Sequence, residues 1–140
     1  MRNGSSIELR MMTGVTPAER AQLTELYRFA GWIGAAESGD FLERAVVGSF
    51  VAVGAFTAAG RLVGFGRALS DGVSDAYLQD IAVHPDFRKR GIGAEIVRFL
   101  TAELRRRGVD WIGLVGEPGT ERFYEGLGFA AQRNFTLWKA

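Results

Sequence analysis

The sequence has no cysteine and only one histidine among its 140 residues. The lack of cysteine excludes disulfides, thiolate metal sites and a cysteine nucleophile, and it fits a reducing compartment. With a single imidazole available, a protein zinc site is not expected either. We therefore expect no metal cofactor.

Long apolar runs and a strong net charge are also missing. No apolar run approaches the roughly 20 residues that span a bilayer, and residues 1–6 are polar, without the apolar centre of a signal peptide. The formal net charge is +1, so the chain has no general electrostatic attraction for nucleic acid or anionic lipid. These absences predict a soluble cytoplasmic protein that binds neither nucleic acid nor a membrane.

What the sequence does contain is typical of a globular protein. Hydrophobic residues make up 47% of it and charged residues 24%. A chain of this length forms one buried core, so residues 1–140 are expected to be a single domain. Hydrophobic periodicities, separated by glycine and proline, predict the element order βααβββαβαβ. We expect an α/β sandwich whose mixed sheet has six to seven strands, with about four helices.

Local sequence patterns predict two helix starts near the N-terminus and closing strands near the C-terminus. Thr16-Pro17-Ala18-Glu19 has the capping-box pattern, with proline at the first helical position. Residues 40–43 repeat a start signal for a shorter helix that runs to about Val47. Residues 129–138 are predicted to supply one or two closing strands, and their apolar end, residues 135–138, is a candidate homodimer interface.

Basic residues and glycines are concentrated between a strand-like run, residues 77–83, and an amphipathic helix-like run, residues 94–107. The segment reads Arg88-Lys89-Arg90-Gly91-Ile92-Gly93. Glycines let an anion approach the backbone, and the N–H groups of a first helical turn attract negative charge. A P-loop needs Lys followed by Ser or Thr after the second glycine, and a dinucleotide fingerprint needs three glycines; neither matches. The segment predicts a phosphate cradle, the alternative being a plain helix start with solvated basic residues.

A second motif, Phe123-Tyr124-x-x-x-Gly128-Phe129, follows at a fixed distance from Arg88-x-x-Gly91-x-Gly93. Together with the element order, the two motifs resemble the GNAT superfamily of acetyl-CoA-dependent N-acetyltransferases over nearly the whole chain. The resemblance implies the GNAT-like acyl-CoA N-acyltransferase fold, acetyl-CoA as cosubstrate and an amine as acceptor.

The resemblance also implies how acetyl-CoA is held. Backbone N–H groups near the glycines take the pyrophosphate, basic residues add charge, and the pantetheine arm lies along the preceding strand. In the family a bulge in that strand splays two parallel strands, which the sequence alone does not show. The implied coenzyme-binding residues are Ile81, Ala82, Val83, Arg88, Lys89, Arg90, Gly91, Ile92, Gly93 and Ala94.

The same resemblance implies that Tyr124 protonates the departing coenzyme A sulfur. A thiolate with an ordinary thiol pKa of about 8.5 leaves more easily when a hydroxyl donates to it. On a short helix Phe123 and Leu127 share the core face, so Tyr124 is expected to point towards the gap between strands. The alternative is a tyrosine whose hydroxyl makes a structural hydrogen bond.

Asp80 and Glu117 are the candidate general bases, because an alkylammonium acceptor must lose a proton before it attacks the thioester. Strand alternation puts Asp80 with Leu78 and Ala82, on the face opposite Ile81. Glu117 follows the neighbouring strand at its C-terminal end, where ligands bind in such sheets. Either carboxylate is alternatively solvated or a helix cap, and some family members use ordered water as the relay.

The resemblance places the acceptor pocket near the first two helices, at about residues 27–41. Tyr27 and Trp32 are the candidate substrate contacts, and an aromatic wall there suits an arylalkylamine; the alternative is that Trp32 packs against the helix pair. Residues 26–32 and 68–72 look most like the small branch that contains plant serotonin N-acetyltransferase. Tyr77 stands where the histone-acetylating branch has its glutamate base, which weakens that interpretation.

The expected function is therefore transfer of acetyl from acetyl-CoA to a primary amine, by direct attack through a tetrahedral intermediate. A small-molecule amine is favoured over a protein. Two alternatives remain open: a non-catalytic acyl-CoA-binding sensor, against which the presence of Tyr124 argues, and an interaction domain without coenzyme. The sequence does not settle the acceptor, the acyl-chain preference, the base or the oligomeric state.

Overall fold

The structure is a computed structural model that describes residues 6–140, so the polar residues 1–5 lie outside it. The helices and strands are β1 (Ile7–Met11), α1 (Pro17–Phe29), α2 (Phe41–Val47), β2 (Val51–Thr57), β3 (Leu62–Ser70), β4 (Asp75–Val83), the 3₁₀ turn η1 (Pro85–Phe87), α3 (Ile92–Arg106), β5 (Trp111–Leu114) and α4 (Glu121–Gly126). None of the helices in this described part is long and apolar enough to cross a membrane.

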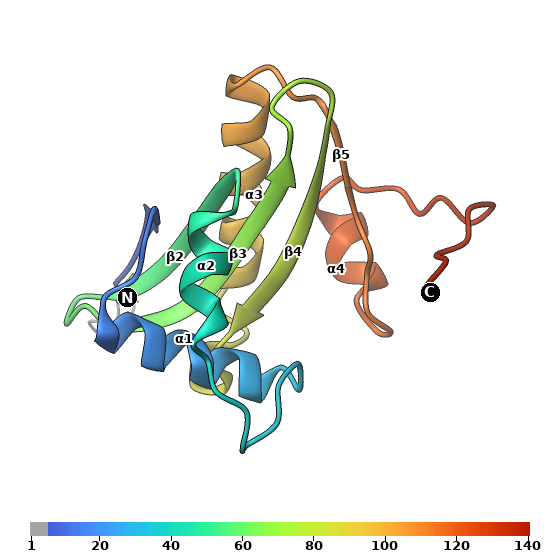
Figure 1. Cartoon of the computed structure of the whole chain (residues 1–140). Coiled ribbons are helices and arrows are strands. Elements are labelled where there is room, and N and C mark those ends of the chain that lie inside the picture. Colours follow the sequence, from blue (N-terminus) through green and yellow to red (C-terminus); the bar gives the residue numbers. More distant parts are fainter. Residues whose placement is uncertain (1–5) are drawn as a thin grey trace.

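One mixed sheet forms the centre of the molecule. Its strand order is β1-β2-β3-β4-β5; the first three pairings are antiparallel and β4 pairs with β5 in parallel. Helices α1 and α2 lie on one face and α3 on the other (Figure 1). The predicted α/β sandwich with four α-helices is confirmed for the described residues.

Each face of the sheet has its own hydrophobic core. The α1-side core includes Leu23, Leu26, Leu42, Phe56 and Phe65. The α3-side core includes Val53, Ile96, Val97, Leu100 and Leu104. The helices form where their sequences provide an apolar stripe facing one of these cores, because amphipathic burial is what holds a helix on a sheet.

The start of α1 has the predicted capping box. The Thr16 side chain accepts a hydrogen bond from the Glu19 N–H at 3.1 Å, and the Glu19 carboxylate accepts one from the Thr16 N–H at 3.0 Å. Pro17 occupies the first helical position. This local chemistry sets where α1 begins and so where Tyr27, about three turns later, meets the sheet.

The prediction of six to seven strands was wrong, because the described chain forms five. Residues 129–138, the predicted closing strands, contain no helix or strand. Every residue from 130 to 138 is exposed. Figure 1 shows this segment leading away from the sheet beyond α4. A strand is stable only when its backbone N–H and C=O groups pair with a neighbour, and this segment has none within its own chain's described sheet.

Candidate active site

A bulge interrupts β4 at Asp80. Arg67 of β3 pairs with Gln79 and Phe65 pairs with Ala82, so Gly66 lies opposite two residues of β4. Asp80 has φ +59°, in the left-handed region that few residues other than glycine adopt. An extra residue in one strand disrupts the ladder and re-aims the side chains that follow. The bulge that the family resemblance implied is therefore present.

The bulge corrects the predicted orientation of Asp80. Leu78 lies in the α3-side core, whereas Ala82 lies in the α1-side core, so these two residues occupy opposite faces of the sheet. Ile81 packs against the α3-side core, as Leu78 does. The prediction that Asp80 shares a face with both Leu78 and Ala82 was wrong, because simple alternation assumes an unbroken period of two.

The Asp80 carboxylate is held by two side chains on the α1 side. The Tyr27 hydroxyl donates to Asp80 Oδ2 at 2.5 Å, and Arg67 Nε donates to the same oxygen at 2.8 Å. The Arg67 and Asp80 side chains are only 16% and 24% exposed. Burial, together with the hydrogen bond to Asp80, raises the pKa of Tyr27, so its hydroxyl stays protonated and continues to donate. An aspartate that is already paired in this way is well suited to holding the bulge.

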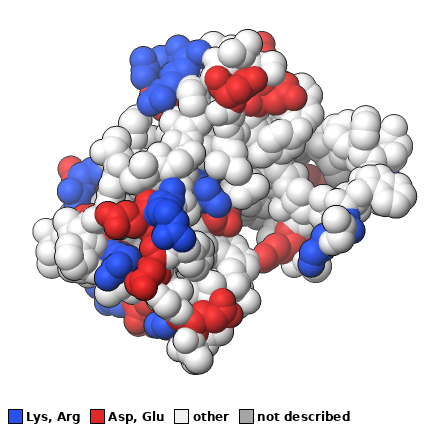
Figure 2. Space-filling model, viewed as in Figure 1, with Lys and Arg blue, Asp and Glu red and all other residues white. Residues whose placement is uncertain are grey.

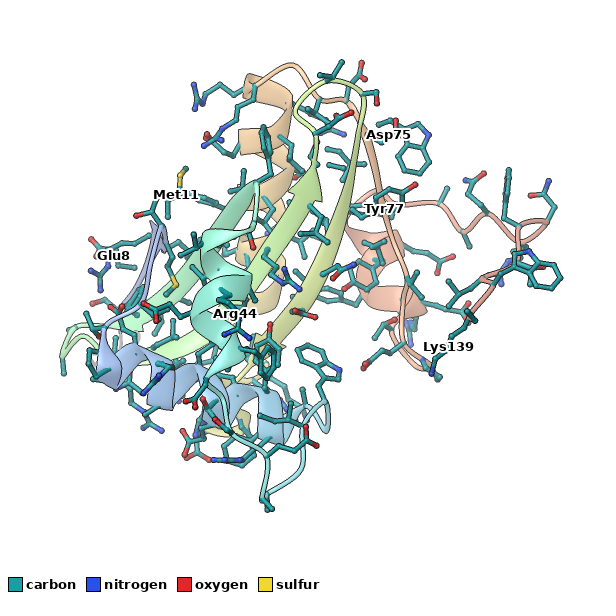
Figure 3. The ribbon with its side chains drawn as sticks, in the orientation of Figure 1. Glu8, Met11, Arg44, Asp75, Tyr77 and Lys139 are labelled. Carbon is teal, nitrogen blue, oxygen red and sulfur yellow. The ribbon has the colours of Figure 1, made fainter. Side chains whose placement is uncertain are left out.

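A cavity opens where β4 and β5 separate. Their parallel pairing runs from Asp75 with Trp111 to Leu78 with Leu114 and then stops. The cavity that follows has a volume of about 280 Å³. It is lined by Trp32, Tyr77, Leu78, Gln79, Asp80, Ile81, Leu114, Val115, Glu117, Thr120 and Tyr124. Tyr77 is a residue of β4 in the part where β5 runs alongside, opposite Gly113 (Figure 3).

All three predicted catalytic candidates, Asp80, Glu117 and Tyr124, line this cavity, together with the predicted substrate contact Trp32. The other predicted substrate contact, Tyr27, does not line it. Tyr27 is 4% exposed and packs in the α1-side core, with its hydroxyl turned to Asp80. The structure therefore places Tyr27 behind the cavity wall instead of in the cavity, because its ring fills the space beneath the sheet.

Tyr124 reaches the cavity from α4. Its ring contacts Phe123 and Phe129 edge-on, with centroid distances of 4.9 and 5.8 Å. Burial raises the pKa of Tyr124, and the negative charge of Glu117 raises it further, so the hydroxyl carries its proton at neutral pH. Phe123, expected on the core face with Leu127, is 38% exposed instead.

Trp32 and Glu117 are joined across 85 residues of sequence. The indole N–H of Trp32, in the loop after α1, donates to Glu117 Oε1 at 2.8 Å, in the loop after β5. Trp32 also packs edge-on against Tyr27, with a centroid distance of 5.2 Å. This hydrogen bond fixes a carboxylate and an aromatic ring on the cavity wall together. Sequence reasoning considered the two residues separately, and no local pattern links them.

The predicted phosphate cradle lies at the start of α3. Gly91 is the N-cap residue with φ +81°, a backbone conformation that favours glycine. The first backbone hydrogen bond of the helix runs from the Glu95 N–H to the Gly91 carbonyl at 3.0 Å. The N–H groups of Ile92, Gly93 and Ala94 therefore have no acceptor within the helix. They point out of its start, where they can bind an anion.

The basic residues before Gly91 are arranged around this helix start. Arg88 Nε donates to the carbonyl of Val83 at 3.1 Å, which ties the loop to the end of β4. The Arg90 guanidinium lies over the Phe87 ring, 5.0 Å from its centroid. Lys89 is exposed and has φ +62°. Arg88 and Arg90 are thus held by contacts with β4 and η1, and all three cations lie within three residues of Gly91 in the sequence.

The end of β4 connects the cradle to the cavity. Ala82 and Val83 pair with Phe65 and Gly64 of β3 on one side. On the other side, the parallel pairing with β5 has already ended at Leu78. The backbone of residues 81–83 therefore presents an edge without a β5 partner, at which an extended ligand with amide groups can form hydrogen bonds.

Residues 6–140 contain no group of three or more His, Cys, Asp or Glu side chains placed to hold a metal ion. His84 is 5% exposed and lies between the rings of Phe29 and Phe87, at centroid distances of 4.9 and 5.9 Å. Its Nδ1 accepts a hydrogen bond from the Asp86 N–H at 3.1 Å. These contacts give His84 a structural role at the end of β4.

Comparison with known proteins shows the family. A model of the GNAT acetyltransferase domain matches residues 48–131. The chain belongs to the GNAT acetyltransferase family. It is 43% identical over 64 residues to serotonin N-acetyltransferase 2, chloroplastic, of Oryza sativa subsp. japonica, a match that covers 46% of this chain and 32% of that protein. A match to the uncharacterized N-acetyltransferase ycf52 of Pyropia yezoensis is 40% identical over 63 residues, 45% of this chain and 36% of the relative. The chain thus matches about a third of the length of these relatives.

Solved structures confirm the fold. A Deinococcus radiodurans R1 chain, named as a candidate acetyltransferase, has a TM-score of 0.80 and 29% identity, covering 99% of this chain and 92% of that one. A GNAT-family acetyltransferase of Streptococcus pneumoniae TIGR4 has a TM-score of 0.77 at 23% identity, covering 96% and 98%. Aminoglycoside N-acetyltransferase AAC(6')-Iy, in complex with CoA, has a TM-score of 0.71 at 16% identity, covering 100% and 98%. The last two share the fold alone.

Proposed function

We propose that this protein transfers an acetyl group from acetyl-CoA to the primary amine of a small molecule. One observation carries the proposal: the cavity lined by Tyr124 reaches Ile81 of β4, and the β4 edge without a β5 partner continues from there to Val83, beside the start of α3 with its free N–H groups. These are the features that an acyl-CoA thioester needs for its pyrophosphate, its pantetheine amides and its sulfur.

The donor is bound mainly by backbone groups. The pyrophosphate of acetyl-CoA binds the N–H groups of Ile92, Gly93 and Ala94 at the start of α3, where the helix dipole favours negative charge. Arg88 and Lys89 add positive charge beside it. The pantetheine arm pairs with the open edge of residues 81–83 and delivers the thioester into the cavity.

In the chemical step, the neutral amine attacks the thioester carbonyl and forms a C–N bond. A tetrahedral intermediate results, and a backbone N–H of β4 stabilises its oxyanion. The intermediate then breaks its C–S bond, the sulfur receives the proton of the Tyr124 hydroxyl, and the proton released by the newly bonded nitrogen returns through solvent to the Tyr124 oxygen. The raised pKa of Tyr124 keeps that proton in place until the sulfur leaves.

Glu117 is better placed than Asp80 to receive the proton of the incoming ammonium, directly or through water. Glu117 is exposed at the cavity and accepts one hydrogen bond, from Trp32. Asp80 is engaged by Arg67 and Tyr27 through the same oxygen, so its negative charge is already compensated. Asp80 is therefore assigned to positioning the bulge.

The cavity wall favours an aromatic amine as acceptor. The rings of Trp32 and Tyr77 line the same space as the carboxylates of Glu117 and Asp80. Aromatic faces attract both apolar rings and cations, and carboxylates attract an ammonium group. The similarity to a protein named serotonin N-acetyltransferase 2 supports the same acceptor class.

The proposal is tested by combining calorimetric binding of acetyl-CoA with a thiol-release assay over an amine panel. The panel contains arylalkylamines, aliphatic amines, an aminoglycoside and a lysine-containing peptide. We expect acetyl-CoA to bind and arylalkylamines to react fastest. Binding without thiol release for any amine would indicate an acyl-CoA sensor, preference for the peptide would overturn the small-molecule acceptor, and a lack of binding would overturn the whole proposal.

A further inference from the structure

Helix α1 ends in a Schellman motif that fixes the position of Trp32. The N–H of Gly31 donates to the Arg28 carbonyl at 3.0 Å, and the N–H of Trp32 donates to the Tyr27 carbonyl at 3.0 Å. Gly31 has φ +79°, the left-handed conformation that this motif uses. The motif is often accompanied by a side-chain contact between the residues that Trp32 and Tyr27 represent, and their rings do pack edge-on. The end of α1 therefore decides where the indole lies.

The ring against which Trp32 packs is itself fixed to the sheet. Tyr27 is buried, and its hydroxyl donates to the Asp80 carboxylate, which also accepts a hydrogen bond from Arg67. Trp32 is partly buried against the same α1-side core. The indole thus has a rigid support on the α1 side, and its N–H is directed to the loop after β5.

Glu117, in that loop, is held at both its backbone and its side chain. Its carbonyl accepts hydrogen bonds from the Thr120 hydroxyl at 2.6 Å and from the Thr120 N–H at 3.2 Å. Its carboxylate Oε1 accepts the indole N–H of Trp32 at 2.8 Å. An exposed glutamate side chain otherwise samples several rotamers. The bond from Trp32 therefore selects the rotamer in which the carboxylate lines the cavity.

This hydrogen bond joins two walls of the cavity, the loop after α1 and the loop after β5. In Figure 1 these loops lie at the lower end of the gap where β4 and β5 part. Figure 2 shows this face of the molecule hollowed between the α1–α2 side and the α4 side, with acidic side chains beside the hollow. Because the bond engages Oε1 of Glu117, Oε2 can receive a proton.

We infer that Trp32 is a positioning residue for the general base: its indole N–H holds the Glu117 carboxylate where the ammonium group of the acceptor enters the cavity. The inference rests on the proposed function, in which Glu117 is the base. It differs from the direct substrate contact that the sequence predicts for Trp32, because the N–H of the indole is used for Glu117. A base must lie within hydrogen-bonding distance of the proton it removes, and a misplacement of about 1 Å costs up to about 100-fold in rate.

The first test compares kcat and the acceptor KM for Trp32→Phe, with the most reactive amine. Phenylalanine keeps an aromatic ring beside Tyr27 but has no N–H. We expect kcat to fall about fivefold and KM to change less than about twofold. Trp138→Phe is the matched control, because Trp138 is 88% exposed in the C-terminal segment, and it should leave both constants unchanged. A raised KM at unchanged kcat would make Trp32 a substrate contact only and would overturn the inference.

A double-mutant cycle tests whether Trp32 acts through Glu117. The base is absent in the Glu117→Gln background, so the position of this side chain no longer affects proton removal. Trp32→Phe should therefore reduce kcat about fivefold in the wild-type background and no further in the Glu117→Gln background. Equal losses in both backgrounds would show that Trp32 acts independently of Glu117, and the inference would fail.

Two helices of this chain end in the same motif, which provides a matched pair of glycines. Gly108 follows α3 with φ +89°, and residues 108 and 109 repeat the two hydrogen bonds of the motif. A Cβ has open space at both Gly31 and Gly108. Gly31→Val and Gly108→Val should therefore strain the backbone and lower Tm similarly. Only Gly31→Val, which displaces Trp32, should lower kcat; a wild-type kcat for Gly31→Val would contradict the inference.

The indole signal tests the hydrogen bond without turnover. The chain has three tryptophans, and the indole N–H signal that Trp32→Phe removes from a proton–nitrogen NMR spectrum is that of Trp32. A bond to a carboxylate moves an indole proton downfield, so the Trp32 signal should shift in Glu117→Ala while the Trp138 signal stays in place. An unshifted Trp32 signal would overturn the inference whatever the activity. A shifted signal in a protein that turns over no amine would instead overturn the proposed function, and the catalytic part of the inference with it.

Discussion

The proposed coenzyme cradle and the cavity between β4 and β5 are built differently. The proposed cradle comes from one contiguous segment, residues 88–94, and the groups proposed to hold the anion are backbone N–H groups at the start of α3. The cavity takes side chains from five parts of the chain: the loop after α1, β4, β5, the loop after β5, and α4. Backbone donors depend on local conformation, whereas the cavity depends on individual side chains. Substitutions should therefore separate coenzyme binding from chemistry.

The largest effect is expected from Tyr124→Phe. Loss of the hydroxyl removes the proton donor to the sulfur, and general acid catalysis contributes about 100-fold or more in rate. Turnover should fall by about that factor while calorimetric affinity for acetyl-CoA stays the same. Tyr77→Phe is the matched control, since Tyr77 lines the same cavity, and it should change turnover less than about twofold. An undiminished rate for Tyr124→Phe would remove Tyr124 from the mechanism.

Asp80→Ala should lower stability. The substitution leaves the half-buried Arg67 guanidinium without its carboxylate and puts alanine at φ +59°. Breaking a partly buried ion pair in this way should lower the free energy of unfolding by about 2 kcal/mol, measured by urea denaturation.

Asp80→Asn distinguishes positioning from catalysis at the same residue. Asparagine tolerates the left-handed backbone and still accepts hydrogen bonds. We therefore expect turnover near that of the wild type, and a loss in the free energy of unfolding about half that of Asp80→Ala. Glu117→Gln is the companion variant, expected to slow the reaction most at neutral pH and least at high pH, where free amine is abundant. If Asp80→Asn abolishes turnover and Glu117→Gln does not, Asp80 is the base.

Gly91→Val should weaken acetyl-CoA binding about tenfold, which corresponds to about 1.4 kcal/mol. A β-branched residue is strained at φ +81°, so the first turn of α3 must shift and its N–H groups lose their alignment. Gly60→Val imposes the same strain at φ +85° in the β2–β3 connection, where a Cβ also has open space. That control should lower stability similarly but leave coenzyme affinity intact; equal losses of affinity would contradict the cradle.

The smallest effect concerns Tyr27 at alkaline pH. Its pKa is raised in the folded protein, so above the ordinary value of about 10 the folded state holds a proton that the unfolded state releases. The free energy of unfolding should then fall with rising pH, by at most about 1.4 kcal/mol per pH unit from this group. Tyr27→Phe should flatten that slope in urea denaturation, and Tyr77→Phe, at an exposed tyrosine, should not. A slope that Tyr27→Phe leaves unchanged would contradict the buried hydrogen bond to Asp80.

The elements predicted well from sequence are those whose signals are local. The capping box at Thr16 and Glu19 and the helix start at the glycine segment each depend on a few neighbouring residues, so backbone sterics and short-range hydrogen bonds decide them. The family resemblance predicted a bulge in β4 but did not predict how the bulge changes the direction of the Asp80 side chain. Alternation placed Asp80 beside Leu78, and the inserted residue reversed that relation.

Other failures came from contacts between distant segments. The hydrogen bond from Trp32 to Glu117 joins loops 85 residues apart, and no pattern in either loop indicates the other. Tyr27 was expected in the acceptor pocket, but core packing turned its hydroxyl to Asp80. Residues 129–138 had a composition suited to closing strands, yet a strand also requires a paired neighbour, which residues 6–140 do not supply.

The sequence by itself indicated the family, the layer architecture and the helix start at which we propose that an anion binds, because hydrophobic periodicity and the residues at a helix start act over one or two turns. Only the tertiary structure decided which side chains share the cavity. That choice depends on one extra residue in β4 and on the point at which β4 and β5 part. Both depend on how the whole sheet packs between its two cores, and that packing involves contacts between segments that are distant in the sequence.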